Sequence, residues 1–415
     1  MARNDPRESV PDPESAAPVT VPPGIDAAAP EDLGVDRAEA VPARAPGHAI
    51  AAGVLLPGAG HALIGMWQRG LGLLFVWGVL LAVVFFAADR IFAPVRPSLD
   101  DWIALATLFG TMLLVWGWSL RDLTVGRRRA AAQGDSQWAI AARQFKRNRL
   151  AIAGLAIIIL LYLVALLAPL VAPYDPIAQA DIATTGHLPP GGEHLLGTDR
   201  FGRDVLSRII YGSRISLAIG FVATAISITI GTLFGAIAGY YAGKLDTIIM
   251  RFTDMVLAFP RLVLLIMIVA LFNASITVII IVLGLTQWPG TTRIVRGDVL
   301  SLREREFIHA AQALGMSRLR IMMRHLIPNV LAPVIVTATL GIGNTIVMEA
   351  GLSFLGLGVS PPTPTWGSMV SEGRDVLLNA WWVATFPGLT IVLVVLAFNL
   401  VGDGLRDALD PRLRT

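Results

Sequence analysis

Cysteine is absent from this sequence of 415 residues. Its absence excludes disulfide bonds, thiolate metal sites and cysteine nucleophiles, and it leaves the redox compartment unspecified. Charged residues are also scarce at 15%, whereas apolar residues make up 54% and are gathered into long blocks. Runs of alternating polar and apolar residues, typical of β-strands, are missing too. The sequence therefore predicts an all-α polytopic membrane protein.

Sequence motifs for catalysis are missing as well. Residues 239–244, GYYAGK, resemble a phosphate-binding loop, but only three residues separate the two glycines and no Ser or Thr follows Lys244. We find no dinucleotide fingerprint, no metal-spaced cluster of His and Glu, and no nucleophile elbow. We therefore expect no catalytic residue, no metal and no cofactor, so that any ATP is hydrolysed by a separate subunit.

Basic residues are concentrated in two segments. Residues 121–149 contain eight Lys and Arg against two Asp, and residues 293–325 contain seven Arg against three acids. Residues 173–208 have the opposite balance, with five acids against three Arg. Because basic loops stay on the cytoplasmic side, the two basic segments are predicted inside and the acidic one outside. The net charge of +3 thus marks membrane orientation, and we expect no nucleic-acid partner.

Composition divides the chain into four parts. Residues 1–47 are rich in Pro and Ala and carry nine acids against four Arg, which predicts a disordered acidic tail, either inert or an interaction arm. Residues 48–120 form an N-terminal membrane module of two helices. Residues 121–149 form a basic linker with an amphipathic helix on the inner membrane surface. Residues 150–415 form the core membrane domain, surrounded by membrane lipid.

The N-terminal module contains two segments long enough to cross the membrane, Gly70–Ala88 and Trp102–Leu120. A third apolar stretch, residues 49–65, is broken by Gly and Pro, and is either re-entrant or interfacial, or a third span. The tail lies in the cytoplasm if two segments cross and outside if three do. His61 within this stretch is predicted to be a polar packing group rather than a ligand.

Six spans are predicted in the core, so that both of its ends lie in the cytoplasm. They are Leu150–Ala172, Ser216–Tyr240, Phe252–Leu271, Ser275–Gln287 continuing toward Thr292, Asn329–Leu357 and Phe386–Val401. Gly243–Arg251 is predicted to be a short turn on the inner side. The small residues of the second span are expected to let another helix approach closely.

The outer segment before the second span has an amphipathic pattern. Its apolar positions share one helical face, and they are Phe201, Val205, Leu206, Ile209 and Ile210. We expect a helix on the outer membrane surface, with an ion pair between Asp204 and Arg208. The tryptophans Trp366, Trp381 and Trp382 are predicted to lie in the interfacial aromatic belt.

A strongly charged loop at residues 303–328 separates two apolar segments. Its first part, Glu306–Leu314, consists of good helix formers. Phe307, Ala311 and Leu314 recur at helical spacing and make one apolar stripe. Such a helix can offer its stripe to the groove of a soluble partner, although an ordinary amphipathic loop has the same pattern.

The second part of this loop continues toward the membrane. Gly315 ends the first helix, and Ser317 can cap a second short helix through His325. Pro328 fits the first turn of the next helix, where its missing N–H costs little. We therefore expect a helix, a turn, a second helix and then the membrane span.

Two acids fall within predicted spans, where an ionisable side chain is costly. Asp254 lies near the inner end of the third span and is a candidate for a structural link or gate. Glu349 lies late in the fifth span, where it either faces substrate or holds helices together. Gln287, Asn344 and Asn399 are weaker candidates, because polar contacts between helices stabilise membrane bundles without touching substrate.

The outer segment carries the most specific pattern in the chain. Its residues are Leu196, Gly197, Thr198, Asp199, Gly202, Arg203, Asp204, Ser207, Arg208, Gly212, Arg214 and Ser216. In order and spacing they resemble the dipeptide, oligopeptide and nickel permeases of C-subunit type among the ATP-binding-cassette importers. The resemblance runs from about Gln137 to Arg414 and includes the stretch GLSFLGLGVSPPTPTW.

The loop at residues 303–328 resembles the coupling loop of the same importers. Its Ala-Ala pair, Gly and Pro fall at that loop's spacing, whereas His309 stands where those permeases have Glu. By this resemblance, the residues that dock on an ATPase subunit are Glu306, Phe307, His309, Ala310, Ala311, Leu314, Gly315 and Pro328.

The resemblance implies a type I importer permease fold with six core transmembrane helices in a bacterial cytoplasmic membrane. It implies as partners a second permease subunit, two ATP-binding subunits and an extracytoplasmic substrate-binding protein. A peptide is the expected substrate, with nickel or another small solute as the alternative. The rival classes are a membrane anchor or sensor and an ion-driven secondary transporter, which should show inverted repeats that this sequence lacks.

Overall fold

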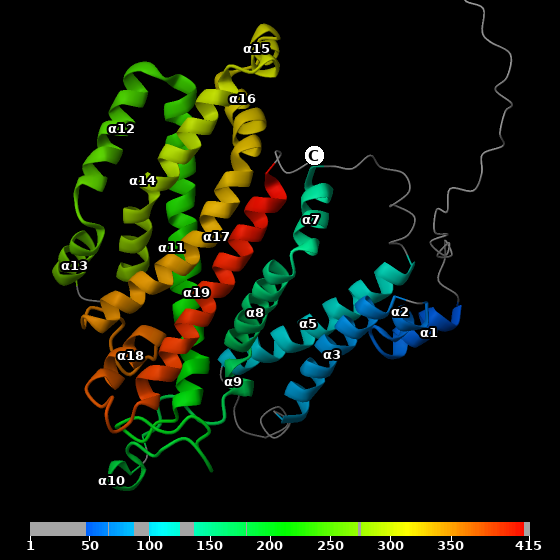
Figure 1. The fold of residues 1–415 in the computed structure, drawn as a ribbon, viewed down its shortest axis with the longest axis vertical. Coiled ribbons are helices and arrows are strands. Elements are labelled where there is room, and N and C mark those ends of the chain that lie inside the picture. Colours follow the sequence, from blue (N-terminus) through cyan, green and yellow to red (C-terminus); the bar gives the residue numbers. More distant parts are fainter. Residues whose placement is uncertain are drawn as a thin grey trace, which may run out of the picture. The chain divides into compact units, whose positions relative to one another are not determined.

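The structure is a computed structural model that describes residues 47–64, 66–86, 99–124, 137–179, 181–272 and 275–410 (Figure 1). The predicted tail lies outside these ranges, apart from Gly47. Within them, the β pairing is limited to two isolated bridges, Gly191 with His194 and Thr198 with Asp204. The predicted all-α fold is confirmed.

The N-terminal module comprises α1 (Gly47–Leu55), α2 (Ala59–Leu63), α3 (Trp67–Phe86) and α5 (Leu99–Thr124). With nine and five residues, α1 and α2 are each too short to cross a membrane, which takes about 20 residues. Helix α5 is long and apolar enough to cross, whereas the apolar part of α3 is confined to Arg69–Ala82. Because residues 87–98 lie outside the described ranges, the span at Gly70–Ala88 stays a prediction.

The module packs against the beginning of the core through leucines. Leu80 of α3 and Leu108 of α5 are fully buried together with Leu167 of the core. Inside the module, His61 is buried and its Nε2 lies 3.1 Å from a carboxylate oxygen of Asp122. His61 therefore joins the second short helix to the end of α5 as a packing group.

The remaining helices form the core. They are α7 (Gln137–Arg147), α8 (Arg149–Leu166), α9 (Ala168–Val171), α10 (Ile182–Thr185), α11 (Val205–Tyr241), α12 (Gly243–Ala258), α13 (Arg261–Leu271), α14 (Ile276–Arg303), α15 (Glu306–Ala313), α16 (Arg318–Ile321), the π-helix η1 (Met322–Leu326), α17 (Ile327–Phe354), α18 (Trp366–Arg374) and α19 (Trp382–Leu409). Five apolar helices, α8, α11, α14, α17 and α19, are long enough to cross a membrane, and the bent pair α12 and α13 makes a sixth crossing if it counts as one.

Helices α11 and α14 pack along most of their lengths because α11 presents glycines to α14. A Cβ built on Gly231, Gly235 or Gly239 would come within 2.8 Å of α14 atoms. Each of these glycines therefore lets the two backbones approach where a side chain would separate them. The close packing predicted for the second span is present.

The second span begins earlier than predicted, and the helix expected on the outer membrane surface is wrong. Asp204 caps α11 by accepting a hydrogen bond from the Ser207 N–H at 2.7 Å. No proline interrupts the chain before Ala242, so α11 runs as one helix of 37 residues. Its first turns bury Ser207 and Arg208 instead of lying on a lipid surface.

The third and fourth spans also differ from the prediction. Gly243–Arg251 is not a turn but the beginning of α12. At Phe259 and Pro260 the chain bends by 83° into α13, because proline has no N–H to continue the helical hydrogen bonds. In contrast, α14 continues through Pro289 and past Thr292.

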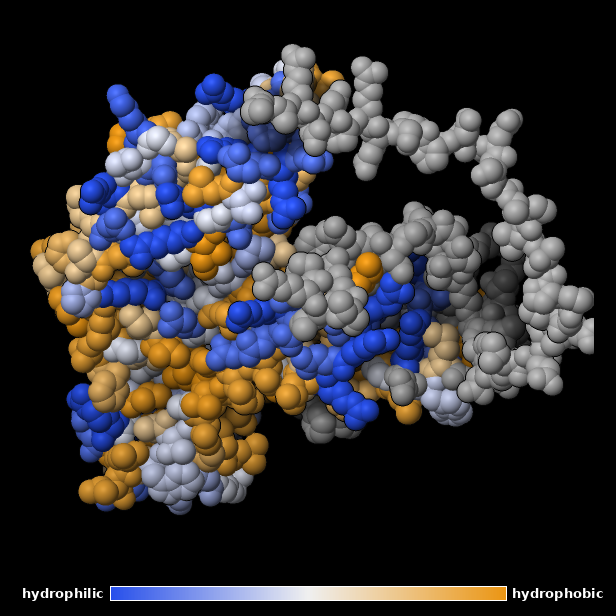
Figure 2. Space-filling model, turned by 45° about the horizontal axis from the view of Figure 1, so that its top comes forward, coloured by the Kyte–Doolittle hydropathy of each residue, from blue (hydrophilic) through white to orange (hydrophobic). Residues whose placement is uncertain are grey.

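The core has two functional ends. In Figure 1, α15 and α16 lie at one end, here called the α15 end, while α10 and α18 lie at the other, here called the α18 end. Figure 2 shows hydrophilic side chains over the α15 end and apolar side chains spread over the side of the core below it. This is the distribution that a membrane-crossing bundle requires.

Candidate functional site

Helix α15 stands on a buried apolar base. Ile308 is fully buried and Ala311 is 5% exposed. Both belong to a cluster that includes Val299 of α14 and Leu326 of η1. The helix predicted over Glu306–Leu314 is confirmed to within one residue, and its base joins it firmly to the ends of two long helices.

The turn after α15 depends on Gly315. Its φ of +74° lies in the left-handed region, and its N–H donates to the carbonyl of Gln312 at 3.0 Å. Ser317 precedes α16 but makes no side-chain cap hydrogen bond. The predicted break between the second helix and the span is wrong, because α16, η1 and α17 follow one another without interruption. The π-turn of η1 directly precedes Pro328 and accommodates its missing N–H.

The loop exposes four large apolar side chains, here called the apolar knob. They are Phe307, Leu314, Leu319 and Met323, exposed by 43%, 83%, 62% and 54%. Ala311 points into the base instead, so the predicted stripe through Phe307, Ala311 and Leu314 is wrong. Exposed arginines rim the knob, namely Arg305, Arg318, Arg320 and Arg324. An apolar patch with a charged rim is typical of a protein-docking surface.

A cleft of about 330 Å³ opens beside α15. Its lining residues are Tyr240, Tyr241, Arg303, Glu304, His309, Gln312 and Arg318. Arg303 pairs with Glu304 at 2.9 Å, and the guanidinium of Arg318 lies 5.9 Å from the centre of the Tyr241 ring. His309 is exposed in this lining, so a partner's side chain can reach it; Glu306 and Ala310 are exposed as well.

Two ion pairs connect α12 to α14 near the α15 end. Asp254 lies 2.6 Å from Arg293, and Asp246 accepts from Arg296 at 2.5 and 2.7 Å. Asp254 and Arg293 are each about half exposed, so their pair contributes little stability. Of the two roles predicted for Asp254, this geometry favours the structural link.

Four buried charged side chains form the outer cluster at the α18 end: Asp199, Arg203, Arg208 and Glu372. Arg203 Nε donates to Asp199 at 2.6 Å, and its Nη2 donates to Glu372 at 3.0 Å. Arg208 donates to Asp199, and its two terminal nitrogens donate to Glu372 at 2.8 and 3.1 Å. Two cations and two anions are thus paired, as burial of ions requires.

Asp204 does not pair with Arg208, so that prediction is wrong. Its carboxylate caps α11 and also lies 3.0 Å from His194 Nδ1. A carboxylate in the N-cap position accepts from the first turn's own N–H groups, which turns it away from the side chain four residues later. Arg208 is left to join the outer cluster.

The other motif residues shape the backbone beside this cluster. Gly197 has φ +78°, and a Cβ there would lie 2.6 Å from Leu188 O and from Trp382 Nε1. Thr198 is fully buried, and its carbonyl accepts from Trp382 Nε1 at 3.1 Å. Gly202 has φ +72°, another left-handed conformation that favours glycine. The motif is therefore a folded unit that docks on α19.

The tryptophan prediction is right at one position and wrong at two. Trp381 is 50% exposed, whereas Trp366 is fully buried and Trp382 is 6% exposed. The indole N–H of Trp366 donates to the carbonyl of Ile209 at 3.1 Å, so it holds α18 against α11. Glu372 had no signal in the sequence, because its partners lie 164 and 169 residues away.

Glu349 is buried in α17 with an exposed fraction of 1%. Its Oε1 accepts from Ser353 Oγ at 2.8 Å and from Thr365 Oγ1 at 3.2 Å. Thr365 is the N-cap of α18, so the carboxylate connects two helices. This favours the packing role among the two that the sequence leaves open for Glu349. Asn344 and Asn399 are exposed on α17 and α19.

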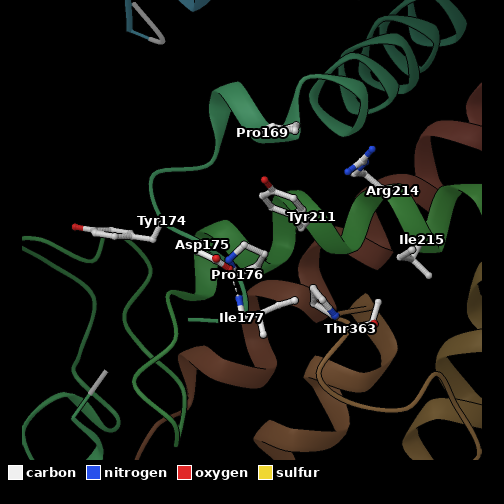
Figure 3. A pocket seen from close by; sticks show the side chains of 10 residues that line it. Pro169, Tyr174, Asp175, Pro176, Ile177, Tyr211, Arg214, Ile215 and Thr363 are labelled. Carbon is white, nitrogen blue, oxygen red and sulfur yellow. Dashed lines mark hydrogen bonds between the residues drawn. The ribbon is translucent and has the colours of Figure 1, made fainter. Parts of the chain in front are cut away.

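A pocket of about 540 Å³ opens at the α18 end. Figure 3 shows Tyr211, Arg214 and Ile215 projecting from α11 on one side of it, with Asp175 and Thr363 on separate loops. A carboxylate and a guanidinium thus line the same opening. The pocket is wide enough to admit part of a small ligand.

A polar row crosses four core helices: Arg261 of α13, Gln287 of α14, Thr345 of α17 and Thr224 of α11. Gln287 Oε1 accepts from Arg261 Nη2 at 2.8 Å and from Thr345 Oγ1 at 2.9 Å. The two threonine hydroxyls lie 3.0 Å apart. Sequence reasoning singled out Gln287 but missed Arg261, which follows the proline at the bend. Among the described residues, no three His, Cys, Asp or Glu side chains are grouped to hold a metal.

Two family models match the chain. The model described as binding-protein-dependent transport system inner membrane component matches residues 231–415. The model described as the N-terminal TM domain of oligopeptide transport permease C matches residues 136–190. Both matches fall on the core and its preceding linker helix, and neither reaches the N-terminal module.

Among curated proteins, the chain is similar to dipeptide transport system permease proteins. It is 47% identical to that of Alkalihalophilus pseudofirmus over 281 residues, which is 68% of this chain and 91% of the relative. It is 46% identical to that of Haemophilus influenzae over 276 residues, which is 65% and 93%. Among solved structures, a methionine ABC transporter in inward-facing form matches 49% of this chain and 96% of its own, with a TM-score of 0.41 and 18% identity.

Proposed function

This chain belongs to the family of binding-protein-dependent transport system inner membrane components, and we propose that it is the membrane-spanning subunit of an ATP-driven peptide importer. The observation that carries the proposal is the 47% identity over 281 residues to a permease named for dipeptide transport. The chain covers 91% of that relative, so the resemblance includes the whole core and not one helix pair. It is a multi-pass protein of the bacterial inner membrane.

The apolar knob is the surface proposed to dock on a separate ATP-binding subunit. Phe307 and Leu314 project from a helix whose other face is buried, so they can enter a groove of the partner. Ile308 and Ala311 connect that helix to α14 and η1 without a flexible segment. Closure of two ATP-binding subunits would then move α15 and, with it, the core spans.

The other partners follow from the same proposal. A second permease subunit would complete the transport path, since one set of six spans forms only half of such an importer. An extracytoplasmic substrate-binding protein would deliver the peptide at the α18 end. The outer cluster supports this assignment, because it fixes the loop before α11, α18 and the beginning of α19 into one rigid face.

The four parts of the chain are assigned accordingly. Residues 150–415 are the permease domain, with the coupling loop at residues 303–328. Residues 121–149 are a basic cytoplasmic linker, which the amphipathic character of α7 supports. Residues 48–120 are an additional membrane module outside the family match, preceded by the acidic tail.

Uptake into proteoliposomes tests the proposal. The complex of this chain, a second permease subunit and two ATP-binding subunits is reconstituted with its substrate-binding protein, and uptake of radiolabelled alanyl-alanine is followed. We expect uptake that needs both internal ATP and the binding protein. Uptake that continues without the ATP-binding subunits and follows an imposed ion gradient would instead identify a secondary transporter.

A further inference from the structure

The polar row contains a cation that no anion of this chain neutralises. We propose that Arg261 binds the carboxylate of the transported substrate inside the membrane. The inference rests on the proposed function, because a peptide carries such a carboxylate at its C-terminus. Four observations support it: the depth of Arg261, the absence of a counter-ion, the geometry of the bend, and the accessibility of the side chain.

Depth follows from the helix positions of its partners. Gln287, which Arg261 contacts, lies 11 residues after the beginning of α14 and 16 residues before its end. At 1.5 Å per residue these separations are about 17 and 24 Å. Thr345 and Thr224 occupy similarly central positions in α17 and α11. Arg261 therefore lies near the middle of the membrane, where an ionised side chain is costly and marks a functional site.

The charge of Arg261 is not balanced within the described residues. Its hydrogen-bond partner, Gln287, is a neutral amide, and its own Nε is buried without a partner. The acids of the neighbouring helices are engaged elsewhere. Asp254 of α12 pairs with Arg293, and Glu349 of α17 accepts from two hydroxyl groups. A guanidinium held this way retains donors for a carboxylate, which it can bind through two parallel hydrogen bonds.

The bend places Arg261 at an interrupted span. It is the first residue of α13, directly after the 83° change of direction at Phe259 and Pro260. Transport proteins place substrate sites at such breaks, since irregular backbone at membrane depth is tolerated where it lines a cavity. The partial positive charge of the α13 N-terminus has the same sign as the guanidinium, so both favour an anion here.

Arg261 is also accessible, since its side chain is neither buried nor fully exposed. A cation that served only to hold Gln287 would need no access. The α12 and α13 surface around it is apolar, with Phe259 and Leu262 exposed by 56% and 41%. A small zwitterion passing this level would therefore meet one charged group that it can pair with.

The test compares alanyl-alanine with its C-terminal amide as transported peptides. Initial uptake rates are measured in the reconstituted complex with the binding protein saturated by each peptide, as checked by titrating that protein alone. We expect the wild type to favour the free acid. Arg261→Gln should lower the free-acid rate on the order of 10- to 100-fold, the cost of one charge-assisted contact, while the amide rate changes little. Arg261→Lys should keep part of the preference.

The control variant is Arg251→Gln, which removes an exposed cation from the same bent pair. It should leave the ratio of the two rates unchanged. Equal loss of both rates in Arg261→Gln would overturn the inference and leave a positioning role. Loss of the second permease subunit on purification of that variant would also overturn it, in favour of an ion pair between subunits. A wild type that takes up neither peptide refutes the proposed function itself.

Discussion

Arg208 and Glu372 lie 164 residues apart in the sequence, yet both terminal nitrogens of the arginine donate to the carboxylate, at 2.8 and 3.1 Å. This two-point contact joins the first turns of α11 to α18. Asp199 and Arg203 complete the pairing from the preceding loop. Because all four ions are shielded from water, each depends on the others for neutralisation.

Glu372→Gln should therefore be strongly destabilising. It leaves two buried guanidinium groups with one carboxylate, and breaking a buried pair costs about 3–5 kcal/mol. The measurement is thermal unfolding of the purified subunit complex in detergent. Asp375→Asn is the matched control, because its pair with Arg374 is exposed and is worth at most about 1 kcal/mol. Similar shifts in the two variants would contradict the assigned role of the cluster.

Leu314→Asp should separate folding from coupling. Leu314 is 83% exposed, so a carboxylate there should change the free energy of unfolding by no more than about 0.5 kcal/mol. The same charge should abolish stimulation of the ATPase by the substrate-loaded binding protein, because it would be desolvated in the partner's groove. Leu195→Asp, a 64% exposed leucine at the α18 end, serves as the control for coupling. Normal stimulation in Leu314→Asp would show that the docking surface lies elsewhere.

Gly315→Pro should disrupt coupling without preventing membrane insertion. Proline fixes φ near −65°, whereas Gly315 has φ +74°, and the substitution also removes the N–H that donates to Gln312. We expect loss of ATPase stimulation with a normal amount of membrane-inserted protein. The comparison is Gly297→Ala, which changes an α14 glycine with open space around its Cβ position. Full stimulation in the proline variant would mean that the orientation of α15 does not matter.

Gly235→Val should push α11 away from α14. The new Cβ would lie 2.7 Å from the Cβ of Val295, and both atoms belong to helices that cannot yield locally. Overpacking of this kind costs typically about 1–3 kcal/mol. A lower unfolding temperature of the complex is expected, whereas Gly290→Val, where the neighbouring space is open, should have a smaller effect. The reverse order would contradict the close approach of the two helices.

Local patterns in the sequence predicted part of this architecture. The helix at Glu306–Ala313, the turn at Gly315 and the position of Pro328 follow from residues that act on their own backbone. Long apolar runs likewise predicted the core spans. These features were predictable because hydrophobic length and turn chemistry are properties of neighbouring residues.

Features that depend on distant residues were not predictable. Pro260 breaks a span while Pro289 lies inside a straight helix, and the difference comes from packing against α11 rather than from the local sequence. Glu372 and Arg261 gain their meaning only from partners on other helices. His309 was noticed as a departure from the family, and the structure places it in a cleft beside Gln312.

Helix α11 also has a mechanical consequence. Its 37 residues make a rod of about 55 Å at 1.5 Å per residue, well beyond the roughly 30 Å hydrocarbon layer. One end carries Arg208 in the outer cluster, and the other carries Tyr240, whose carbonyl accepts from Arg303 next to α15. A tilt of this rod at the α15 end must swing its far end in the opposite direction. The two faces of the membrane are thereby geared together by one continuous lever.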